Sequence, residues 1–373
     1  MSNQAREIYA LSLNQIASAI YANYQARDIG KVSILVEGHM GTGKSSLLNI
    51  VQKMLPDHIA CYCDCSTKDL GDLTIPNIGI MDDKSKFVTF VTNEELGLHL
   101  NKPIILMIDE YGKANTAVKN AMNRLLLEGK LGSYTLHEDS VVFANTNLGA
   151  EGVGDLLLPH HRNRISVIQS RKPDAEEWCA WGVNNNIDVA LLGFCQDSHY
   201  GGMLFQSFQE VSDPDKNKFI FHPKAVGRTA FVTPRSLEKA SNWLRRRHLF
   251  DETTLTALLI GTIGAPAATE LMAFISVAND LPRLDEIKND PENAPIPTSN
   301  AALVMTVYRT LAVLDRSWVD SWITYLNRLE PEAQGYFAQG VRDPSYEKQS
   351  IVYQSAGFRD WAVEHGYMFS ADQ

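Results

Sequence analysis

Short apolar runs alternate with segments of helical spacing along the first half of the chain. Four runs have the length and composition of buried strands, and helical segments separate the first three of them. The strand candidates are residues 31–36, 58–65, 102–108 and 140–144, and helices are predicted over residues 6–27 and 45–55. Strands that alternate with helices are typical of a doubly wound parallel sheet. We therefore predict an α/β fold for this half.

After residue 172 the strand signals fade and helical spacing dominates. Helices are predicted over residues 174–183, 187–195, 234–248, 253–260, 267–278 and 301–325, and within 330–373, where Tyr336, Phe337, Trp361 and Phe369 are aromatic anchors. Residues 284–300 contain three prolines and many Asp and Asn residues, which is the composition of a linker. We expect three parts: an α/β core over residues 1–170, an all-helical lid over 171–282, and a linker with a C-terminal helical block over 283–373.

Charge and composition argue against several classes of protein. The formal net charge of −10 disfavours non-specific binding to nucleic acid or to anionic membranes. The apolar stretch 255–278 is interrupted by Gly261, Gly264, Pro266 and Glu270, so two buried helices are predicted there instead of a membrane span. The N-terminal residues lack the pattern of a secretory signal, and we expect a cytoplasmic protein.

Three of the five cysteines, Cys61, Cys63 and Cys65, alternate along one strand candidate. On a strand their side chains share one face. Such a cluster can bind a soft metal, but no His or Cys pair follows at the spacing of a zinc site. We therefore predict buried core cysteines and no resident metal at this cluster.

The first strand candidate is followed by a glycine-rich phosphate-binding motif. Residues 38–45 have the sequence GHMGTGKS, a full G-x4-G-K-[ST] match between a strand and a helix. In this motif backbone N–H groups surround phosphates, while Lys44 reaches the β- and γ-phosphates and Ser45 binds Mg²⁺. The candidate nucleotide-binding residues are Gly38, His39, Met40, Gly41, Thr42, Gly43, Lys44, Ser45 and Ser46. The motif predicts ATP and Mg²⁺ as ligands.

A second signal is the apolar run at residues 104–108, which ends in Asp109 and Glu110. A carboxylate at the end of a neighbouring strand can complete the Mg²⁺ shell, a role that we assign to Asp109. The adjacent Glu110 can polarise an attacking water, and such a second acid favours hydrolysis over transfer to another acceptor. A solvated acidic pair at the start of a helix is the alternative.

Five segments together resemble the AAA+ ATPases, and their sequences are similar to those of the MoxR and cobaltochelatase CobS branch. These segments are GHMGTGKS at residues 38–45, DLGDL at 69–73, IDEYGKA at 108–114, LLLEGKLGSY at 125–134 and ANTN at 144–147. The resemblance extends over roughly residues 30–282. It implies an oligomeric ATPase with a P-loop core and a helical lid.

The resemblance also implies further catalytic residues around the nucleotide. Asn147 matches the sensor 1 position, which orients the attacking water, and Asn145 competes for this role. The segment at residues 158–165 is similar to the one that delivers an arginine finger to a neighbouring subunit. We assign the finger to Arg164, with Arg162 as the second choice, because a guanidinium stabilises charge on the transferred phosphoryl group.

A sensor 2 arginine is implied at the start of a predicted helix. Thr233 is a suitable N-cap and Pro234 suits the first helical position, which places Arg235 in the first turn. Whether Arg235 acts on the nucleotide of its own subunit or of the neighbour stays open. The basic run at residues 245–248 is interpreted as the C-terminal turn of the same helix, where it complements the helix dipole, in preference to a nucleic-acid patch.

Two further segments correspond to family elements that line a ring pore or face a client protein. Residues 130–136 can form a β-hairpin, and residues 78–91 can form an insertion. Both segments are short, which weakens the prediction that a polypeptide is threaded through a pore.

We therefore predict a bacterial or phage-encoded, Mg²⁺-dependent ATPase. The finger residue Arg164 would act between subunits, so the active form is expected to be a homo-oligomeric ring, with a hexamer as the leading stoichiometry. The resemblance implies remodelling of a client protein or metal-insertion chaperoning, with a von Willebrand A-domain protein as partner. The alternatives are a nucleic-acid motor or loader of the McrB or helicase-loader kind, and an ATP-binding ring that turns over little.

Overall fold

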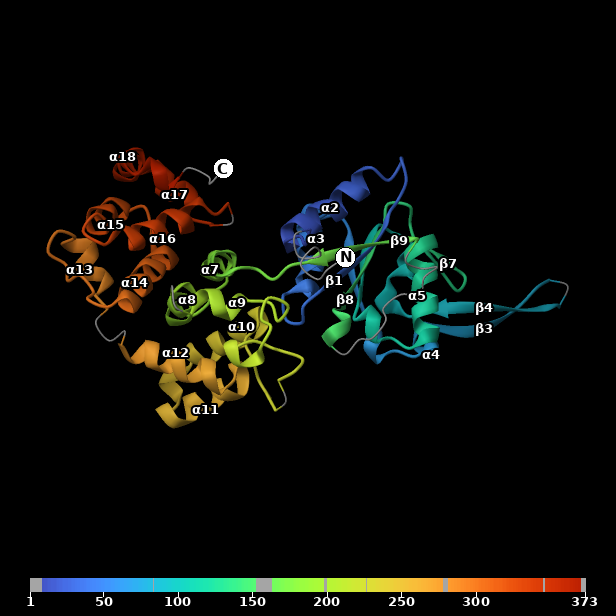
Figure 1. The fold of residues 1–373 in the computed structure, drawn as a ribbon. Coiled ribbons are helices and arrows are strands. Elements are labelled where there is room, and N and C mark those ends of the chain that lie inside the picture. The colour runs from blue at the N-terminus through green and yellow to red at the C-terminus, as the bar shows by residue number, and fades with distance from the viewer. Residues whose placement is uncertain are drawn as a thin grey trace. The chain divides into compact units, whose positions relative to one another are not determined.

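The computed structural model describes residues 9–82, 84–151, 163–197, 200–225, 227–277, 281–344 and 346–369. The chain divides into two compact units, Met1–Lys172 and Pro173–Gln373. The first unit contains a parallel sheet with helices, and the second is built from helices (Figure 1).

A five-stranded parallel sheet forms the centre of the first unit, with strand order β2-β5-β8-β1-β9. Its strands are β1 (Ser33–Gly38), β2 (Ile59–Asp64), β5 (Ile104–Asp109), β8 (Val141–Asn147) and β9 (Ile165–Ser170). The predicted α/β class with a parallel sheet is confirmed. The sequence did not reveal β9, because this edge strand buries only its two end residues and therefore has no apolar run.

Helices cover both faces of the sheet (Figure 1). Helices α2 (Leu13–Gln25) and α3 (Leu47–Met54) bury Ile16 and Val51 against Val36 and Met107 on one face. Helix α5 (Thr116–Glu128) packs on the other face, in one core cluster with alternate residues of β5. The three clustered cysteines are buried in that second layer, as predicted, although Cys65 lies just after β2 in the turn Cys65–Thr67.

Two antiparallel hairpins complete this unit. The predicted hairpin at residues 130–136 is present as β6 (Lys130–Leu131) and β7 (Tyr134–Thr135). The predicted insertion is longer than expected, because β3 (Thr74–Ile80) and β4 (Lys86–Thr92) pair over their whole length. Together with the one-turn helix α4 (Leu70–Leu73), this hairpin occupies the stretch that was predicted to be helical.

The second unit is helical throughout its regular elements. Its helices are α7 (Ala175–Asn184), α8 (Val189–Gln196), α9 (Gly201–Phe205), α10 (Pro234–Leu244), α11 (Glu252–Ile263), α12 (Ala265–Val277), α13 (Leu284–Asn289), α14 (Asn300–Val313), α15 (Val319–Leu326), α16 (Pro331–Arg342), α17 (Gln349–Gln354) and α18 (Ala356–Glu364). Leu191 and Phe194 share one buried core with Val304 and Met305. The division of this unit into a lid and a C-terminal block remains a prediction.

Three segments of the second unit differ from the sequence prediction. The expected linker contains α13, and its later residues are held by Arg328, which donates to the carbonyls of Pro291 and Ala294 at 2.6 and 2.9 Å. The expected helix over residues 301–325 is two helices, because Asp315 accepts the Ser317 N–H and forms a turn between them. The helix predicted to reach residue 248 ends at Leu244.

Among the helices of the described residues, none is long and apolar enough to cross a membrane.

Candidate nucleotide site

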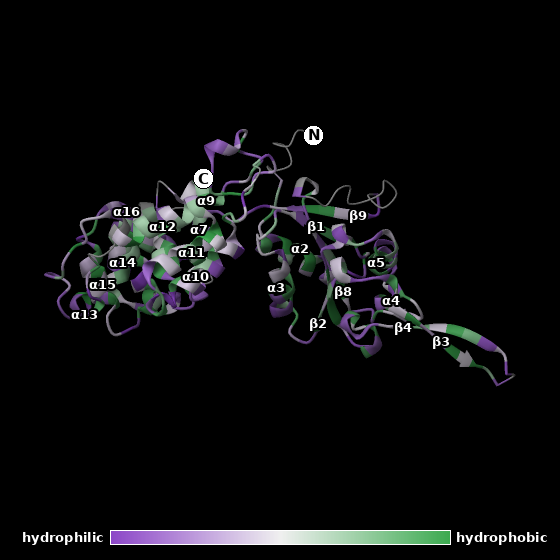
Figure 2. Ribbon diagram, turned by 90° about the horizontal axis from the view of Figure 1, so that it is seen from below, coloured by the Kyte–Doolittle hydropathy of each residue, from purple (hydrophilic) through white to green (hydrophobic). Residues whose placement is uncertain are grey.

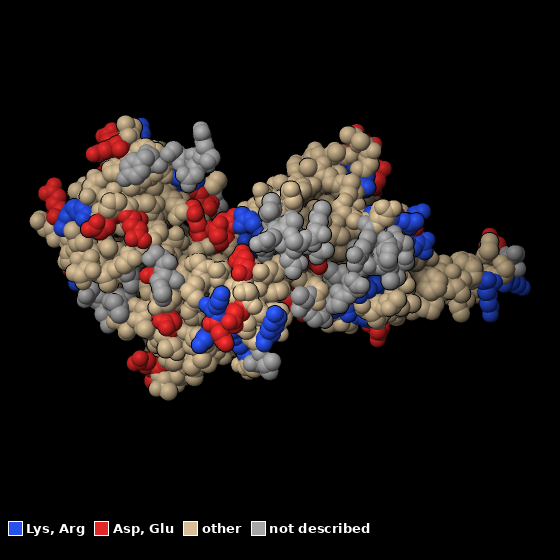
Figure 3. Space-filling view, in the orientation of Figure 1, with Lys and Arg blue, Asp and Glu red and all other residues tan. Residues whose placement is uncertain are grey.

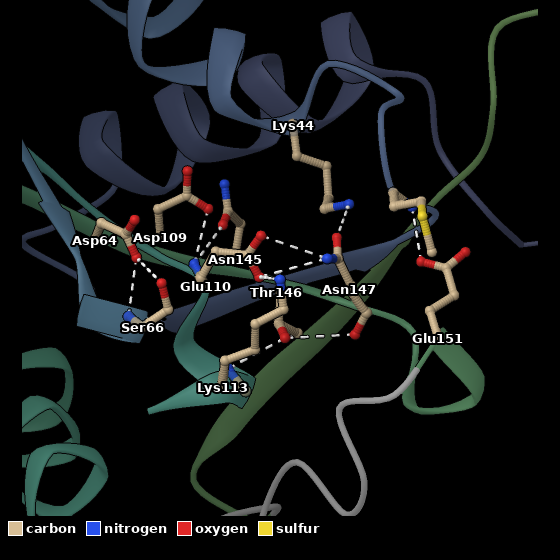
Figure 4. A network of polar contacts seen from close by, with 12 residues as sticks. Lys44, Asp64, Ser66, Asp109, Glu110, Lys113, Asn145, Thr146, Asn147 and Glu151 are labelled. Carbon is tan, nitrogen blue, oxygen red and sulfur yellow. Dashed lines mark hydrogen bonds and ion pairs between the residues drawn. The ribbon is translucent and has the colours of Figure 1, made fainter. Parts of the chain in front are cut away.

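The predicted site residues converge because three strands lie side by side. In the order β5-β8-β1, the strands place Asp109, Asn147 and Gly38 at their carboxyl-terminal ends, and Gly38 is paired in register with Asn147. Ligands of open α/β sheets bind outside this edge. Figure 4 shows Lys44, Asp109, Glu110 and Asn147 gathered there.

Glycines give the P-loop its conformation. Gly41 and Gly43 have positive φ angles of 71° and 93°, in the left-handed region that a side chain disfavours. A Cβ atom on Gly38 would lie 2.9 Å from the Cβ atom of Ser170 in the neighbouring strand β9. The loop then leads through the turn Lys44–Ser46 into α3, as the motif predicts.

Lys44 is held inside the loop with only 6% of its surface exposed. Its ammonium group donates to the carbonyls of Gly38 and His39, at 2.8 and 2.6 Å, and to Oδ1 of Asn147 at 2.9 Å. An ammonium has three donor hydrogens. Two of them fix the side chain on its own loop, and the contact to Asn147 links the loop to β8.

Ser45 and Asp109 place two oxygen atoms next to each other. Ser45 Oγ donates to Asp109 Oδ2 at 2.9 Å, and the Asp109 carboxylate is 6% exposed. Mg²⁺ prefers such oxygen ligands and keeps other positions for phosphate and water, so these two residues fit the ion. Within the described residues, no group of three or more His, Cys, Asp or Glu side chains could hold a metal by itself.

Tyr62 on β2 also donates to Asp109 Oδ2, at 2.9 Å. Burial, and then the negative charge of Asp109, raise the pKa of the Tyr62 phenol above its ordinary value. The phenol therefore stays protonated and keeps donating to the carboxylate. Asp109 Oδ2 thus accepts from two hydroxyl groups, those of Tyr62 and Ser45, which fix its orientation.

Glu110 has an unusual backbone conformation directly after β5. Its φ of 51° lies in the left-handed region, which costs a non-glycine residue about 1–3 kcal/mol and persists mainly at functional sites. Two hydrogen bonds stabilise this conformation: the Glu110 N–H donates to Asp109 Oδ1 at 2.8 Å and to Asn145 Oδ1 at 3.3 Å. The carboxylate pairs with Lys113 at 3.0 Å and remains 26% exposed, so water can reach it.

The two asparagines of β8 have different surroundings. Asn147 donates from Nδ2 to both carboxylate oxygens of Glu110, at 3.4 Å, while its Oδ1 accepts from Lys44. Asn145 is fully buried and supports the backbone of Glu110. The amide that lies between the P-loop lysine and the candidate base is therefore that of Asn147.

The two predicted arginines occupy separate units. Arg164 is exposed immediately before β9, and the competing Arg162 lies outside the described residues. Arg235 is an exposed residue in the first turn of α10, where Thr233 is the N-cap and Pro234 the first helical residue, as predicted.

The basic run after α10 does not form the last helical turn that the sequence suggested. Arg245 is the C-cap of the helix, and Arg247 lies in the turn Arg247–Leu249. Arg247 pairs with the largely buried Asp188 at 3.2 Å. The run therefore begins at the end of the helix but continues beyond its last turn, and one of its four basic residues forms an ion pair.

Sequence reasoning assigned no role to three residues that complete the site: Tyr62, Lys113 and Glu151. Lys113 lies three residues after Glu110 within IDEYGKA, so its spacing could have indicated the ion pair. Tyr62 is two residues before Asp64, the register partner of Asp109, so strand alternation could have placed it. Glu151 contacts residues more than one hundred positions away, and no local pattern indicates that.

Comparisons with known proteins find similarity among solved structures. No protein-family model matches the sequence, and no curated protein matches it. Among solved structures the chain is similar to one in the closed-state cryo-EM structure of Hsp104 with ATPγS and FITC-casein, at 18% identity and a TM-score of 0.37. The match covers 48% of this chain and 36% of that chain.

The strand order and the positions of the motifs define the class of the fold. A P-loop follows β1, an acidic pair follows β5, a polar asparagine ends β8 between them, and a helical region follows the sheet. The fold is an α/β fold with a five-stranded parallel sheet and a P-loop, followed by a helical region.

Proposed function

We propose that this protein binds ATP with Mg²⁺ and hydrolyses it. The observation that supports the proposal is the convergence of Lys44, Asp109, Glu110 and Asn147 at one edge of the sheet. A cation, an oxygen pair for Mg²⁺, an exposed carboxylate and a polar amide are the groups that phosphoryl transfer to water requires.

Each residue has one part in this chemistry. Lys44 neutralises charge on the β- and γ-phosphates, and Ser45 with Asp109 would hold Mg²⁺, whose charge would stabilise the phosphate oxygens. Glu110 accepts a proton from the water whose oxygen attacks the γ-phosphorus, while the bond to the bridging oxygen of ADP breaks. Asn147 orients that water through its amide.

The test is phosphate release by the purified protein with ATP, in Mg²⁺ and in EDTA. We expect turnover only with Mg²⁺, and Asp109→Asn should lower it by about 100-fold, because the carboxylate that anchors the ion is lost. Asp57→Asn, at an exposed turn before β2, is the matched control. Turnover in EDTA, or an unchanged rate for Asp109→Asn, would refute the assignment of the metal site.

We further propose that the active form is a homo-oligomeric ring, with six subunits as the expected number. The exposed position of Arg164 supports this, since its guanidinium is available to a neighbouring subunit. The motif resemblance assigns it the role of a finger that acts across the interface, and Arg235 that of sensor 2.

The work coupled to hydrolysis is proposed to be remodelling of a partner protein, in the manner of the MoxR and CobS-like branch. The hairpin β3–β4 supports this proposal, because apolar residues along it are exposed (Figure 2). One face of the hairpin presents Pro76, Ile78, Ile80, Val88 and Phe90 in cross-strand register. Exposed apolar patches of this kind mark protein contact sites.

The end of this hairpin carries charges of both signs. Asp82, Lys84 and Lys86 are exposed there, and Figure 3 shows acidic and basic side chains at this end of the α/β unit. An exposed apolar stripe with a charged end suits a protein client that presents apolar residues with polar ones beside them. We propose such a client, with a von Willebrand A-domain protein as the partner that the branch implies.

A further inference from the structure

We propose that Glu151 is a positioning residue that locks one peptide plane of the P-loop and thereby sets the affinity for ATP. This inference rests on the proposed nucleotide site. Glu151 ends the short turn Gly149–Glu151, four residues beyond Asn147, and its side chain is 1% exposed. Its Oε2 accepts the Met40 N–H at 2.8 Å, and its Oε1 lies 3.0 Å from Nδ1 of His39 (Figure 4).

A carboxylate with so little exposure requires partners for both oxygens. Burying an unpaired charge costs several kcal/mol. Here one oxygen faces a backbone N–H and the other a histidine ring, and both donors come from the P-loop. His39 is thus the P-loop residue whose side chain contacts Glu151.

The contacts of Glu151 and Lys44 meet on the same peptide unit. The carbonyl of His39 and the N–H of Met40 belong to one planar trans peptide, so they point in opposite directions. The carbonyl accepts from Lys44 Nζ at 2.6 Å and from Thr42 Oγ1 at 2.9 Å. The N–H donates to Glu151 on the other side. This plane is thus held from both sides.

A rotation of this peptide would remove a carbonyl from Lys44. The ammonium would lose one of the two loop contacts that aim it, and the loop would present a carbonyl oxygen in a different direction. The Glu151 contact opposes that rotation and also polarises the peptide, which strengthens the bond on its carbonyl side. Glu151 therefore acts through Lys44 and does not need to touch ATP.

A purely electrostatic effect of Glu151 on ATP would change the affinity in the opposite direction. If Glu151 influenced ATP only through its charge, then Glu151→Gln would tighten binding by removing repulsion. If it braces the loop, Glu151→Ala weakens binding by about tenfold, as expected for loss of a charge-assisted hydrogen bond. Glu151→Gln should then fall between the two proteins, because an amide oxygen still accepts the Met40 N–H.

The experiment combines two measurements on the full-length protein. Hydrogen exchange without nucleotide follows the peptide that contains Met40, and titration with a fluorescent ATP analogue in Mg²⁺ gives Kd. We expect faster exchange of that peptide and weaker binding in Glu151→Ala, with both effects partly restored in Glu151→Gln. Glu128→Ala, which removes an exposed carboxylate paired with Arg124, is the control.

Each outcome has a defined meaning. Native exchange and native Kd in Glu151→Ala would overturn the inference, as would tighter binding by Glu151→Gln. If Glu151→Ala does not fold, Glu151→Gln and His39→Gln provide the same comparison, since each removes only part of the contact. Failure of the native protein to bind ATP would overturn the proposed function itself, which the native titration shows independently of any variant.

Discussion

Replacement of Lys44 by alanine isolates the contribution of the P-loop cation. The ammonium makes two contacts to its own loop and one to Asn147. When ATP binds, we expect the donor on Asn147 to turn to a phosphate oxygen, because the loop carbonyls keep the other two. A hydrogen bond with a charged partner contributes about 1.5–3 kcal/mol. Loss of that single bond corresponds to a rise in Kd of about 10- to 160-fold.

The fold should tolerate this change. Removal of the ammonium leaves buried oxygen acceptors without their donor, but it also removes the cost of burying a charge, and the two effects oppose each other. The assay is titration of a fluorescent ATP analogue in Mg²⁺, with thermal unfolding as the check on folding. Lys53→Ala, at an exposed position in the last turn of α3, is the control. A Kd for folded Lys44→Ala within about twofold of the native value would refute the reasoning.

Three further variants test other parts of the account. Tyr62→Phe removes one donor to Asp109, so the Mg²⁺ concentration for half-maximal turnover should rise about threefold; an unchanged requirement would leave Tyr62 without a role. Arg164→Ala and Glu110→Gln proteins should each be inactive. If the finger acts between subunits, an equal mixture should recover about a quarter of the native sites, because a site then needs Glu110 from one subunit and Arg164 from its neighbour. No recovery would contradict this. Ile78→Asp changes a position that is 66% exposed, so ATP hydrolysis without client and the melting temperature should stay unchanged. The variant should abolish the stimulation of hydrolysis by unfolded carboxymethylated α-lactalbumin. Retained stimulation would exclude the hairpin as the contact.

The sequence was sufficient to place the central residues of the site. A P-loop and an acidic pair each follow an apolar run, and parallel strands bring their carboxyl-terminal ends to one edge. That logic located Lys44, Asp109 and Glu110 relative to one another. It could not choose between Asn145 and Asn147, because both lie on the same face of β8, and only the contacts to Lys44 and Glu110 distinguish them.

The features that escaped prediction depend on distant contacts or on partial burial. Strand β9 is an edge strand in which the polar residues Ser166 and Gln169 interrupt the apolar run. The hairpin β3–β4 exposes apolar residues on both faces, so burial does not produce a simple alternation there. Glu151 contacts Met40 of the P-loop, 111 positions earlier in the chain, and no pattern in the residues around Glu151 predicts this contact.

The most direct test of the central claim is a comparison of ATP binding and phosphate release in Glu110→Gln, with Glu95→Gln at an exposed position as the control. The amide keeps an oxygen that can accept from Asn147 but cannot accept a proton from water. We predict ATP affinity within about threefold of native and phosphate release lowered by at least about 100-fold. Phosphate release at the native rate, with binding intact, would contradict the assignment of Glu110 as the base and with it the proposed mechanism of hydrolysis.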